Sequence, residues 1–122
     1  MPELTLQRIP FSVEADNRLR TLKSRTGITP NILCRIGFCL SIEEPGIPPY
    51  LPENFKTGRE INRYTLFGKY DQIFVALLIT RMVRDNLSLV GIDQAFLAHI
   101  NRGIEILAAR IKSVSDLAHL EG

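Results

Sequence analysis

The sequence predicts a mostly α-helical protein: a compact bundle of about five helices with a short N-terminal strand or arm. Three observations lead to this expectation. Apolar residues recur at helical spacing in several segments, helix-capping residues stand at the segment boundaries, and no internal repeat or low-complexity stretch is present. The 122 residues are enough for one domain with its own core, so residues 1–122 are expected to form a single helical domain.

The chain opens with a short strand or arm over residues 4–11, LTLQRIPF. Leu4 and Leu6 alternate with Thr5 and Gln7, which is the period of a half-buried strand. Pro10 lacks a backbone donor and therefore indicates a sheet edge or the end of the strand.

A first helix is expected over residues 13–26, between a Ser12 cap and Gly27 as the residue that ends it. Glu14 and Asp16 fall in the first turn, where the helix dipole favours negative charge. One face is marked for burial by Ala15, Leu19, Leu22 and Thr26, and the rest of the surface carries Arg18, Arg20, Lys23 and Arg25.

The second helix begins within GITPNILCRIGFCL, residues 27–40. Thr29 is expected to cap it, with Pro30 at the first helical position, where a missing N–H costs nothing. Apolar side chains cover almost its whole circumference and Arg35 is its one charge, so the pattern predicts a buried helix and not one that reads a DNA groove.

The middle of the chain contains a proline-rich connector followed by a basic and aromatic segment. Residues 43–55 hold four of the seven prolines and are expected to be neither helix nor central strand. Residues 55–70 alternate basic and aromatic side chains: Phe55, Lys56, Arg59, Arg63, Tyr64, Phe67, Lys69 and Tyr70. Its cations suit phosphates, and its aromatic rings could stack on unpaired bases at a nick or a flap. The rings at 64, 67 and 70, however, have the spacing of an inward helical stripe and are expected in the core.

The C-terminal half predicts two long helices and a short one. The first spans about residues 71–87 around the apolar run IFVALLI. The second opens at Gly91 and Ile92, with one apolar stripe formed by Ile92, Phe96, Ile100, Ile104, Leu107 and Ile111. Ser113 is expected to cap the last helix, with Asp116 three residues on in the manner of a capping box.

Net charge and hydropathy restrict where the protein can be located and which partners it can bind. The net charge is only +2, with six Lys and Arg against three Asp and Glu in residues 1–40, so a basic face has to arise from folding or from oligomer symmetry. The first ten residues lack the apolar core of a signal peptide, and the longest apolar run, residues 73–79, is seven residues long. We therefore expect a soluble, cytoplasmic protein with no membrane partner.

Motifs of catalysis are missing, and we expect no catalytic residue, metal or cofactor. Cys34 and Cys39 stand five apart in an apolar helix, where burial makes a thiol unreactive. One alternative is a DNA-nicking enzyme in which Glu60 and Asp71 hold Mg²⁺, although acidic residues on a surface are usually only solvated.

Two groups of basic residues are the candidates for DNA contact. They are Arg18, Arg20, Lys23 and Arg25 on the first helix, and Lys56, Arg59, Arg63 and Lys69 in the middle segment. Neutralising phosphates releases counterions and so strengthens binding, but an exposed face of Lys and Arg is often no more than solvated.

The order of strand, helix, GITPN turn and apolar helix over residues 4–40 resembles the ribbon-helix-helix repressors. That resemblance implies a dimer whose strand residues, here Thr5 and Gln7, read the major groove. Pro10 in the ribbon and some eighty further residues depart from the pattern, and the implied function is a sequence-specific transcription factor.

A longer resemblance covers nearly the whole chain. The segments TGITPNILCRIGFCLSIEEP, GREINRYTLFGKYD and GIDQAFLAHINRGIEIL, in this order, resemble the DndE family of DNA phosphorothioation proteins. The resemblance implies a small helical, non-catalytic protein that acts with other Dnd proteins. It also implies a homotetramer that binds duplex DNA, preferentially at nicks, through surface lysines and arginines. A scaffold whose basic residues meet only acidic protein partners is the remaining alternative.

Overall fold

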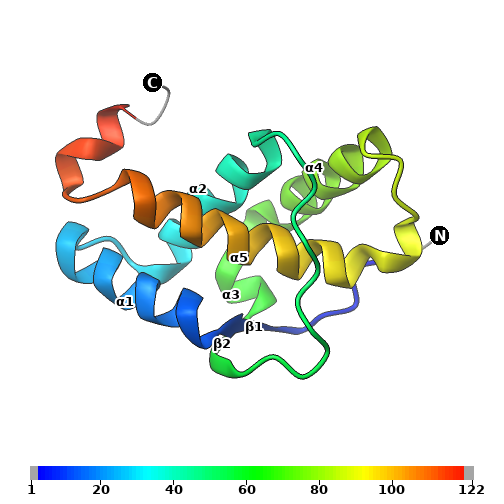
Figure 1. Cartoon of the computed structure of the whole chain (residues 1–122), viewed down its shortest axis with the longest axis horizontal. Helices are drawn as coiled ribbons and strands as arrows, with labels where there is room; N and C mark the ends of the chain where they lie inside the picture. The colour runs from blue at the N-terminus through cyan, green and yellow to red at the C-terminus, as the bar shows by residue number, and fades with distance from the viewer. Residues whose placement is uncertain (1–2, 120–122) are drawn as a thin grey trace.

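The computed structural model describes residues 3–119 and confirms a mostly helical fold with a short N-terminal strand (Figure 1). No helix within these residues is long and apolar enough to cross a membrane. The elements in chain order are β1 (Arg8–Ser12), α1 (Val13–Thr26), α2 (Pro30–Glu43), β2 (Thr57–Asn62), α3 (Arg63–Phe67), η1 (Gly68–Tyr70), α4 (Asp71–Arg84), η2 (Leu89–Gly91), α5 (Ile92–Arg110) and η3 (Val114–His119), where η marks a short 3₁₀ helix.

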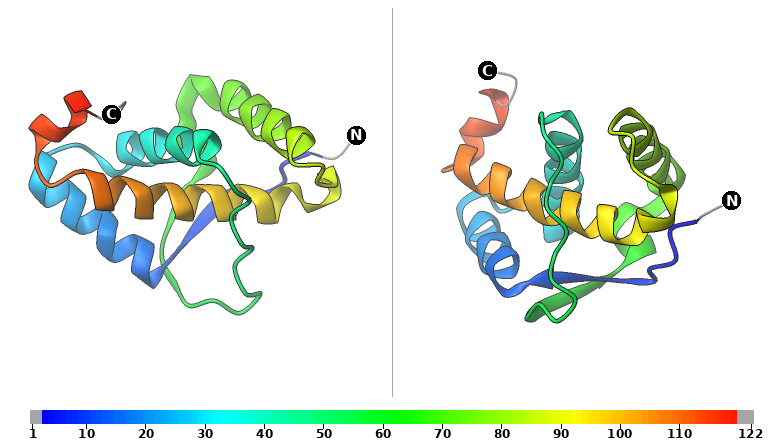
Figure 2. Two further views of the ribbon diagram at one scale, coloured as in Figure 1. Left: turned by 45° about the horizontal axis from the view of Figure 1, so that its top comes forward. Right: turned by 45° about the vertical axis from the view of Figure 1, so that its right-hand side comes forward.

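Helix α5 runs along the length of the molecule and contacts α1, α2 and α4 (Figures 1 and 2). Its predicted apolar stripe is confirmed: Ile92, Phe96, Ile100, Ile104, Leu107 and Ile111 are all buried. Helices α2 and α5 approach each other most closely at Gly37 and Gly103. A Cβ atom built on Gly103 would lie 2.1 Å from the carbonyl oxygen of Gly37, so only glycine allows this crossing.

Four phenylalanines join α3 and α4 to the α2–α5 pair. The rings of Phe67 and Phe74 stack with centroids 4.4 Å apart, and Phe38 meets both of them edge-on. Phe96 completes the cluster, with its centroid 5.6 Å from those of Phe38 and Phe67. Such ring pairs add to the stabilisation that burial alone supplies.

The two strands form one antiparallel ribbon, with Ile9 opposite Ile61 and Pro10 opposite Glu60. Strand β1 begins at Arg8, later than the expected residue 4, because the backbone N–H of Thr5 is held by the Asp93 carboxylate at 2.9 Å. Strand β2 was not predicted from the sequence. Since β1 pairs with a strand of its own chain and Thr5 is bonded to Asp93, this ribbon differs from the two-chain ribbon of the ribbon-helix-helix repressors.

The helix ends largely follow the sequence. Ser12 Oγ accepts a hydrogen bond from the Ala15 N–H (3.1 Å), and Gly27 has φ +73°, as expected for the residue that ends α1. Thr29 occupies the cap position of α2, but its side chain makes no capping hydrogen bond. In the predicted capping box, Asp116 Oδ2 accepts from the Ser113 N–H (3.1 Å), which is one half of that motif.

The basic and aromatic segment departs from expectation in its rings. Phe67 is buried, but Tyr64 and Tyr70 are 52% and 43% exposed, so the inward stripe of three rings was wrong. Gly68, with φ +57°, ends α3 as its first residue beyond the helix, begins η1, and breaks the helical period on which the stripe depended. Helix α4 also ends at Arg84, three residues before the expected position, and Asn86 follows it with φ +60°.

Candidate nucleic-acid interface

Helix α1 places its four cations on two different sides. At about 100° per residue, Arg18 and Arg25 lie on one side of the helix, and Arg20 and Lys23 lie on the other. The buried stripe of Ala15, Leu19 and Leu22 runs between them, and all four cations are exposed. The expected basic surface is therefore two surfaces.

Arg20 and Arg59 meet on a single carboxylate. The Asp16 side chain is 6% exposed and accepts from Arg20 Nη2 at 3.2 Å and from Arg59 Nε at 2.8 Å. Strand β2 can pass this close because residue 58 is glycine: a Cβ there would lie 2.7 Å from Asp16 Oδ2. Asp16 thus joins α1 to β2 and leaves the two arginines with one positive charge in excess.

Two lysines near opposite ends of α1 have ammonium groups that make no hydrogen bond or ion pair within residues 3–119, and Lys56 lines a pocket with Glu14 and Glu105. Lys56 is exposed at the start of α1, where its carbonyl oxygen accepts from the Val13 N–H (3.1 Å), and Lys23 is exposed in the last turn of α1. We name Arg20, Lys23, Lys56 and Arg59 the basic strip. The strip follows the length of α1, roughly 21 Å for 14 residues at 1.5 Å each.

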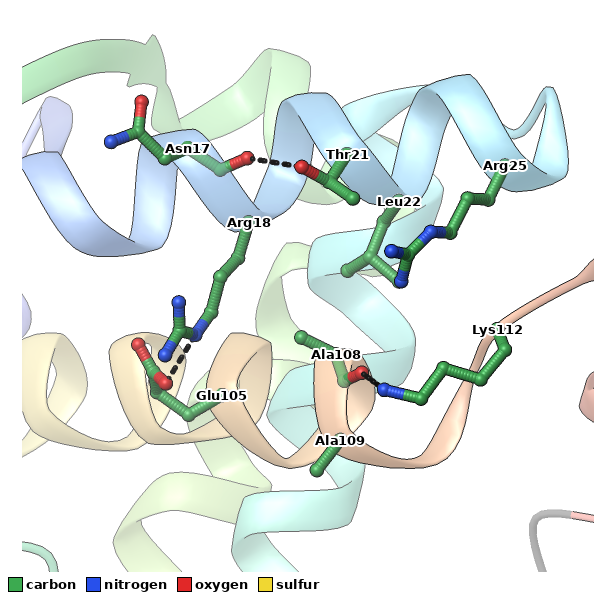
Figure 3. Close-up of a pocket in the computed structure, with 9 residues that line it drawn as sticks. All are labelled: Asn17, Arg18, Thr21, Leu22, Arg25, Glu105, Ala108, Ala109 and Lys112. Carbon is green, nitrogen blue, oxygen red and sulfur yellow. Dashed lines mark hydrogen bonds and ion pairs between the residues drawn. The ribbon is translucent and has the colours of Figure 1, made fainter.

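The other side of α1 faces the C-terminal part of α5 across a groove of about 390 Å³ (Figure 3). Arg18 and Arg25 line it from α1, and Lys112 lies just beyond the end of α5. Glu105 on α5 pairs with Arg18, with Nε and Oε2 2.5 Å apart. This α1–α5 groove was not predicted, because Glu105 and Lys112 are almost 80 or more positions from the end of α1 in sequence and no local pattern links them to it.

Two of the eight predicted DNA-contacting residues lie elsewhere. Arg63 is 9% exposed, donates from Nε and Nη2 to both oxygens of Asp71, and donates from Nη1 to the Leu4 carbonyl at 2.8 Å. The hydrogen bonds to Asp71 raise the pKa of Arg63. Arg63 therefore has a structural role, and its contact with DNA stays a prediction. Lys69 is exposed on η1, with its ammonium 5.3 Å from the centre of the Tyr70 ring.

A buried polar cluster fastens the end of α2 and the start of the proline-rich connector. Arg81 and Arg102 donate to the carbonyl oxygens of Ser41, Ile42, Glu44 and Gly46. Arg102 Nε also donates to Ser41 Oγ at 2.9 Å, and Ser41 Oγ shares a hydrogen bond of 2.8 Å with His99 Nδ1. Burial together with Arg102 and Arg81 lowers the pKa of His99 to about 4, so the ring is neutral at pH 7.

We expect the protein to lose stability as the pH falls through the range from 6.5 to about 4. The unfolded chain takes up a proton at His99 near pH 6.5, whereas the folded chain resists it down to about pH 4, so acid favours unfolding by up to about 3 kcal/mol. Urea unfolding at pH 7, 5.5 and 4.5 measures this. A His99→Gln variant should show a smaller decline over the same range, and an equal decline in both proteins would contradict the assignment.

The thiols and the two proposed metal-binding carboxylates are engaged in the fold. Burial raises the pKa of Cys34 to about 12, and burial followed by the charge of Glu43 raises that of Cys39. Glu60 pairs with Arg8 at 3.4 Å, and Asp71 with Arg63. Within residues 3–119, no three His, Cys, Asp or Glu side chains gather closely enough to hold a metal ion.

An apolar surface lies exposed on α2 and α4. A groove of about 310 Å³ between the two helices is lined by Ile36, Cys39, Leu40 and Phe74, and flanked by the charges of Arg35 and Glu43. Large apolar side chains are also exposed at Ile32 on α2 and at Ile73 and Leu77 on α4, each between 37% and 58%.

Comparison with known proteins gives a consistent result. The family model described as DndE, DNA sulphur modification protein DndE, matches residues 8–115. A crystal structure of DndE from Escherichia coli B7A, described as involved in DNA phosphorothioation modification, shares 28% identity over 86% of this chain and 99% of its own, with a TM-score of 0.66. A mutant of DndE involved in DNA phosphorothioation shares 27% identity over 85% and 98%, with a TM-score of 0.62. No curated protein matches the chain.

Proposed function

This chain belongs to the DndE family of DNA sulphur modification proteins, and from that premise we propose that it is a non-catalytic, DNA-binding subunit of the phosphorothioation machinery. Its partners are duplex DNA, bound preferentially at nicks, and other Dnd proteins. A homotetramer and a cytoplasmic location are part of the same proposal.

The basic strip is the observation that carries DNA binding. Arg20 and Arg59 share the Asp16 carboxylate, and Lys23 and Lys56 add two unpaired cations along about 21 Å of α1. At 3.4 Å per nucleotide, that length corresponds to about six phosphates of one DNA strand. The arginines at Asp16 are held in place, while Lys23 and Lys56 are free to move toward phosphates.

Assembly of several copies is supported by the exposed apolar surface on α2 and α4. Contiguous apolar surface of this kind marks protein–protein contacts, and Ile73 and Leu77 lie in the part of α4 beside the α2–α4 groove. A net charge of +2 gives each copy weak attraction to DNA. Copies joined through this surface would bring several basic strips to one duplex at a high effective concentration.

The surroundings of Cys34 and of two carboxylates support a non-catalytic role. A thiol that transfers sulfur has to be accessible and ionised, whereas Cys34 is buried with a pKa of about 12. The carboxylates of Glu60 and Asp71, considered for Mg²⁺-dependent nicking, are paired with arginines.

Reversing the charge of the basic strip should weaken DNA binding. In the double variant Lys23→Glu/Lys56→Glu, we expect affinity for a nicked duplex at low salt to fall by roughly 100-fold. The slope of log affinity against log salt should decrease by about two, because two phosphates are no longer neutralised. Fluorescence anisotropy over a salt series measures both quantities, beside an intact duplex of the same sequence and the mass of each protein in solution.

Arg84→Glu is the matched control, since it reverses an exposed cation of α4 away from the strip. Its affinity should stay within a few-fold of wild type. A wild-type protein that is monomeric and indifferent to DNA at low salt would overturn the proposal, as would a double variant that binds like the wild type.

A further inference from the structure

The α1–α5 groove contains more positive than negative charge, and its cations come from two elements. Arg18, Arg25 and Lys112 line it against the single carboxylate of Glu105, which leaves a formal surplus of two positive charges. Figure 3 shows Arg18 reaching from α1 to Glu105 on α5, Arg25 running back along α1 to end beside Leu22, and the Lys112 ammonium within 3.5 Å of the Ala108 carbonyl oxygen. All three cations line the groove.

Among the described residues, only one of the three cations has an ionic partner inside the groove. The Arg25 guanidinium is exposed and makes no hydrogen bond or ion pair in the part of the chain that the structure describes. Arg18 pairs with Glu105, but the two side chains are 47% and 43% exposed. An ion pair that is so exposed to water contributes little to stability. An anion of higher charge can therefore replace Glu105 as the partner of Arg18 at small cost in free energy.

We propose that the α1–α5 groove binds a terminal phosphomonoester of a broken DNA strand. A phosphomonoester carries a charge of about −1.5 to −2 at pH 7, which matches the surplus in the groove. A phosphodiester within an intact strand carries a single charge, so it competes less well with the Glu105 carboxylate. Arg18 changes partner from Glu105 to the phosphate, and Arg25 and Lys112 bind the remaining oxygens.

The location of the groove relative to the basic strip fits this ligand. Arg18 and Arg25 lie on the side of α1 opposite to Arg20 and Lys23, so one helix separates the groove from the strip. The basic strip binds the backbone of the continuous DNA strand, and the α1–α5 groove binds the end of the broken strand. The two sites are about one helix diameter, roughly 10 Å, apart. This inference rests on the proposed DNA-binding function and names what a nick offers that an intact duplex lacks.

The test compares four duplexes of one sequence with the full-length protein: intact, nicked with hydroxyls on both strand ends, nicked with a 5′-phosphate, and nicked with a 3′-phosphate. We expect one of the phosphate-bearing nicks to bind roughly tenfold more tightly than the hydroxyl nick, because charge-assisted hydrogen bonds form only with the phosphate. The two phosphate duplexes identify which strand end enters the groove.

Variants separate the groove from the strip. Arg25→Ala/Lys112→Ala should remove the advantage of the phosphate and leave binding to the hydroxyl nick within a few-fold of wild type. Glu105→Gln should raise affinity for the phosphate-bearing nick several-fold, because the competing carboxylate is gone. Arg84→Ala, an exposed arginine on α4, should preserve the phosphate advantage.

The outcomes distinguish this inference from the function on which it rests. If no duplex binds, the proposed DNA-binding function fails. If all nicked duplexes bind equally and the Arg25 and Lys112 double variant weakens each of them alike, DNA binding stands and the phosphomonoester site is rejected. An unchanged affinity in Glu105→Gln rejects the partner exchange at Arg18.

Discussion

Alanine at Gly103 is expected to lower the melting temperature of the protein by roughly 10 °C. The added Cβ would lie 2.1 Å from the Gly37 carbonyl oxygen and 2.3 Å from its carbon, whereas real Cβ contacts of this kind stay beyond 3.0 Å. Both obstacles are backbone atoms of α2, which no change of side-chain rotamer can move. The two central helices therefore have to separate, and the packing between them loosens along its length.

The size of the effect comes from two opposing terms. Overpacking of a core costs about 1–3 kcal/mol and occasionally more, and a clash of two backbones belongs at the upper end. Alanine in place of glycine favours a helix by about 1 kcal/mol, which offsets part of that cost. We expect a net loss of about 2 kcal/mol in the free energy of unfolding, measured by circular dichroism during heating.

The reverse substitution on the same helix is the control. Ala109 is exposed, so Ala109→Gly should cost only the helix-propensity difference of about 1 kcal/mol. Gly37→Ala, whose Cβ would lie 2.9 Å from the Gly103 carbonyl group, should be destabilising but less so than Gly103→Ala. A Gly103→Ala protein with a higher melting temperature than the wild type would contradict the prediction. It would mean that the gain in helix propensity exceeds the cost of the clash, and that α2 and α5 do not cross this closely.

The features that the sequence predicted well are local. Helix α1 was expected at its observed residues because Ser12 and Gly27 act on their immediate neighbours, and the α5 stripe followed from a repeat within one helix. Strand β2 was missed because its residues were interpreted for charge, and its strand character depends on β1, about fifty positions away.

In the candidate site, too, the sequence predicted the local features and missed the contacts between residues far apart in the chain. Which residues of α1 are exposed cations could be predicted from periodicity. Asp16 fitted the acidic first turn of a helix, yet its main partner, Arg59, stands 43 positions away on β2. Arg63 was grouped with the DNA-contacting residues because its sequence neighbours are basic and aromatic, and nothing local indicates its pairing with Asp71.

Methionine at Arg81 is expected to destabilise the protein by about 3 kcal/mol and to loosen the proline-rich connector. The Arg81 side chain is 3% exposed; it donates to Asp85 at 2.8 Å, to the Ile42 carbonyl at 2.6 Å and to the Glu44 carbonyl at 2.8 Å. Methionine fills a similar volume, so the loss arises from unpaired polar groups and not from a cavity.

The position of these groups explains why the connector should respond. They include the last carbonyls of α2, which carry the negative end of the helix dipole, and the Gly46 carbonyl within the connector. Hydrogen exchange of amides in residues 44–55 should accelerate in Arg81→Met before global unfolding. Arg81→Lys, which keeps the charge but lacks the fork of donors, should give an intermediate loss.

Arg102 contacts some of the same carbonyl groups as Arg81 and therefore limits the loss of stability expected in Arg81→Met. It also donates to the carbonyls of Ser41, Glu44 and Gly46, so these groups keep a partner when Arg81 is replaced. Ile42 and Asp85 have no such second partner within the described chain, and the predicted loss is therefore concentrated on them. An Arg81→Met protein with wild-type melting and unchanged exchange at residues 44–55 would show that Arg102 alone fastens the connector.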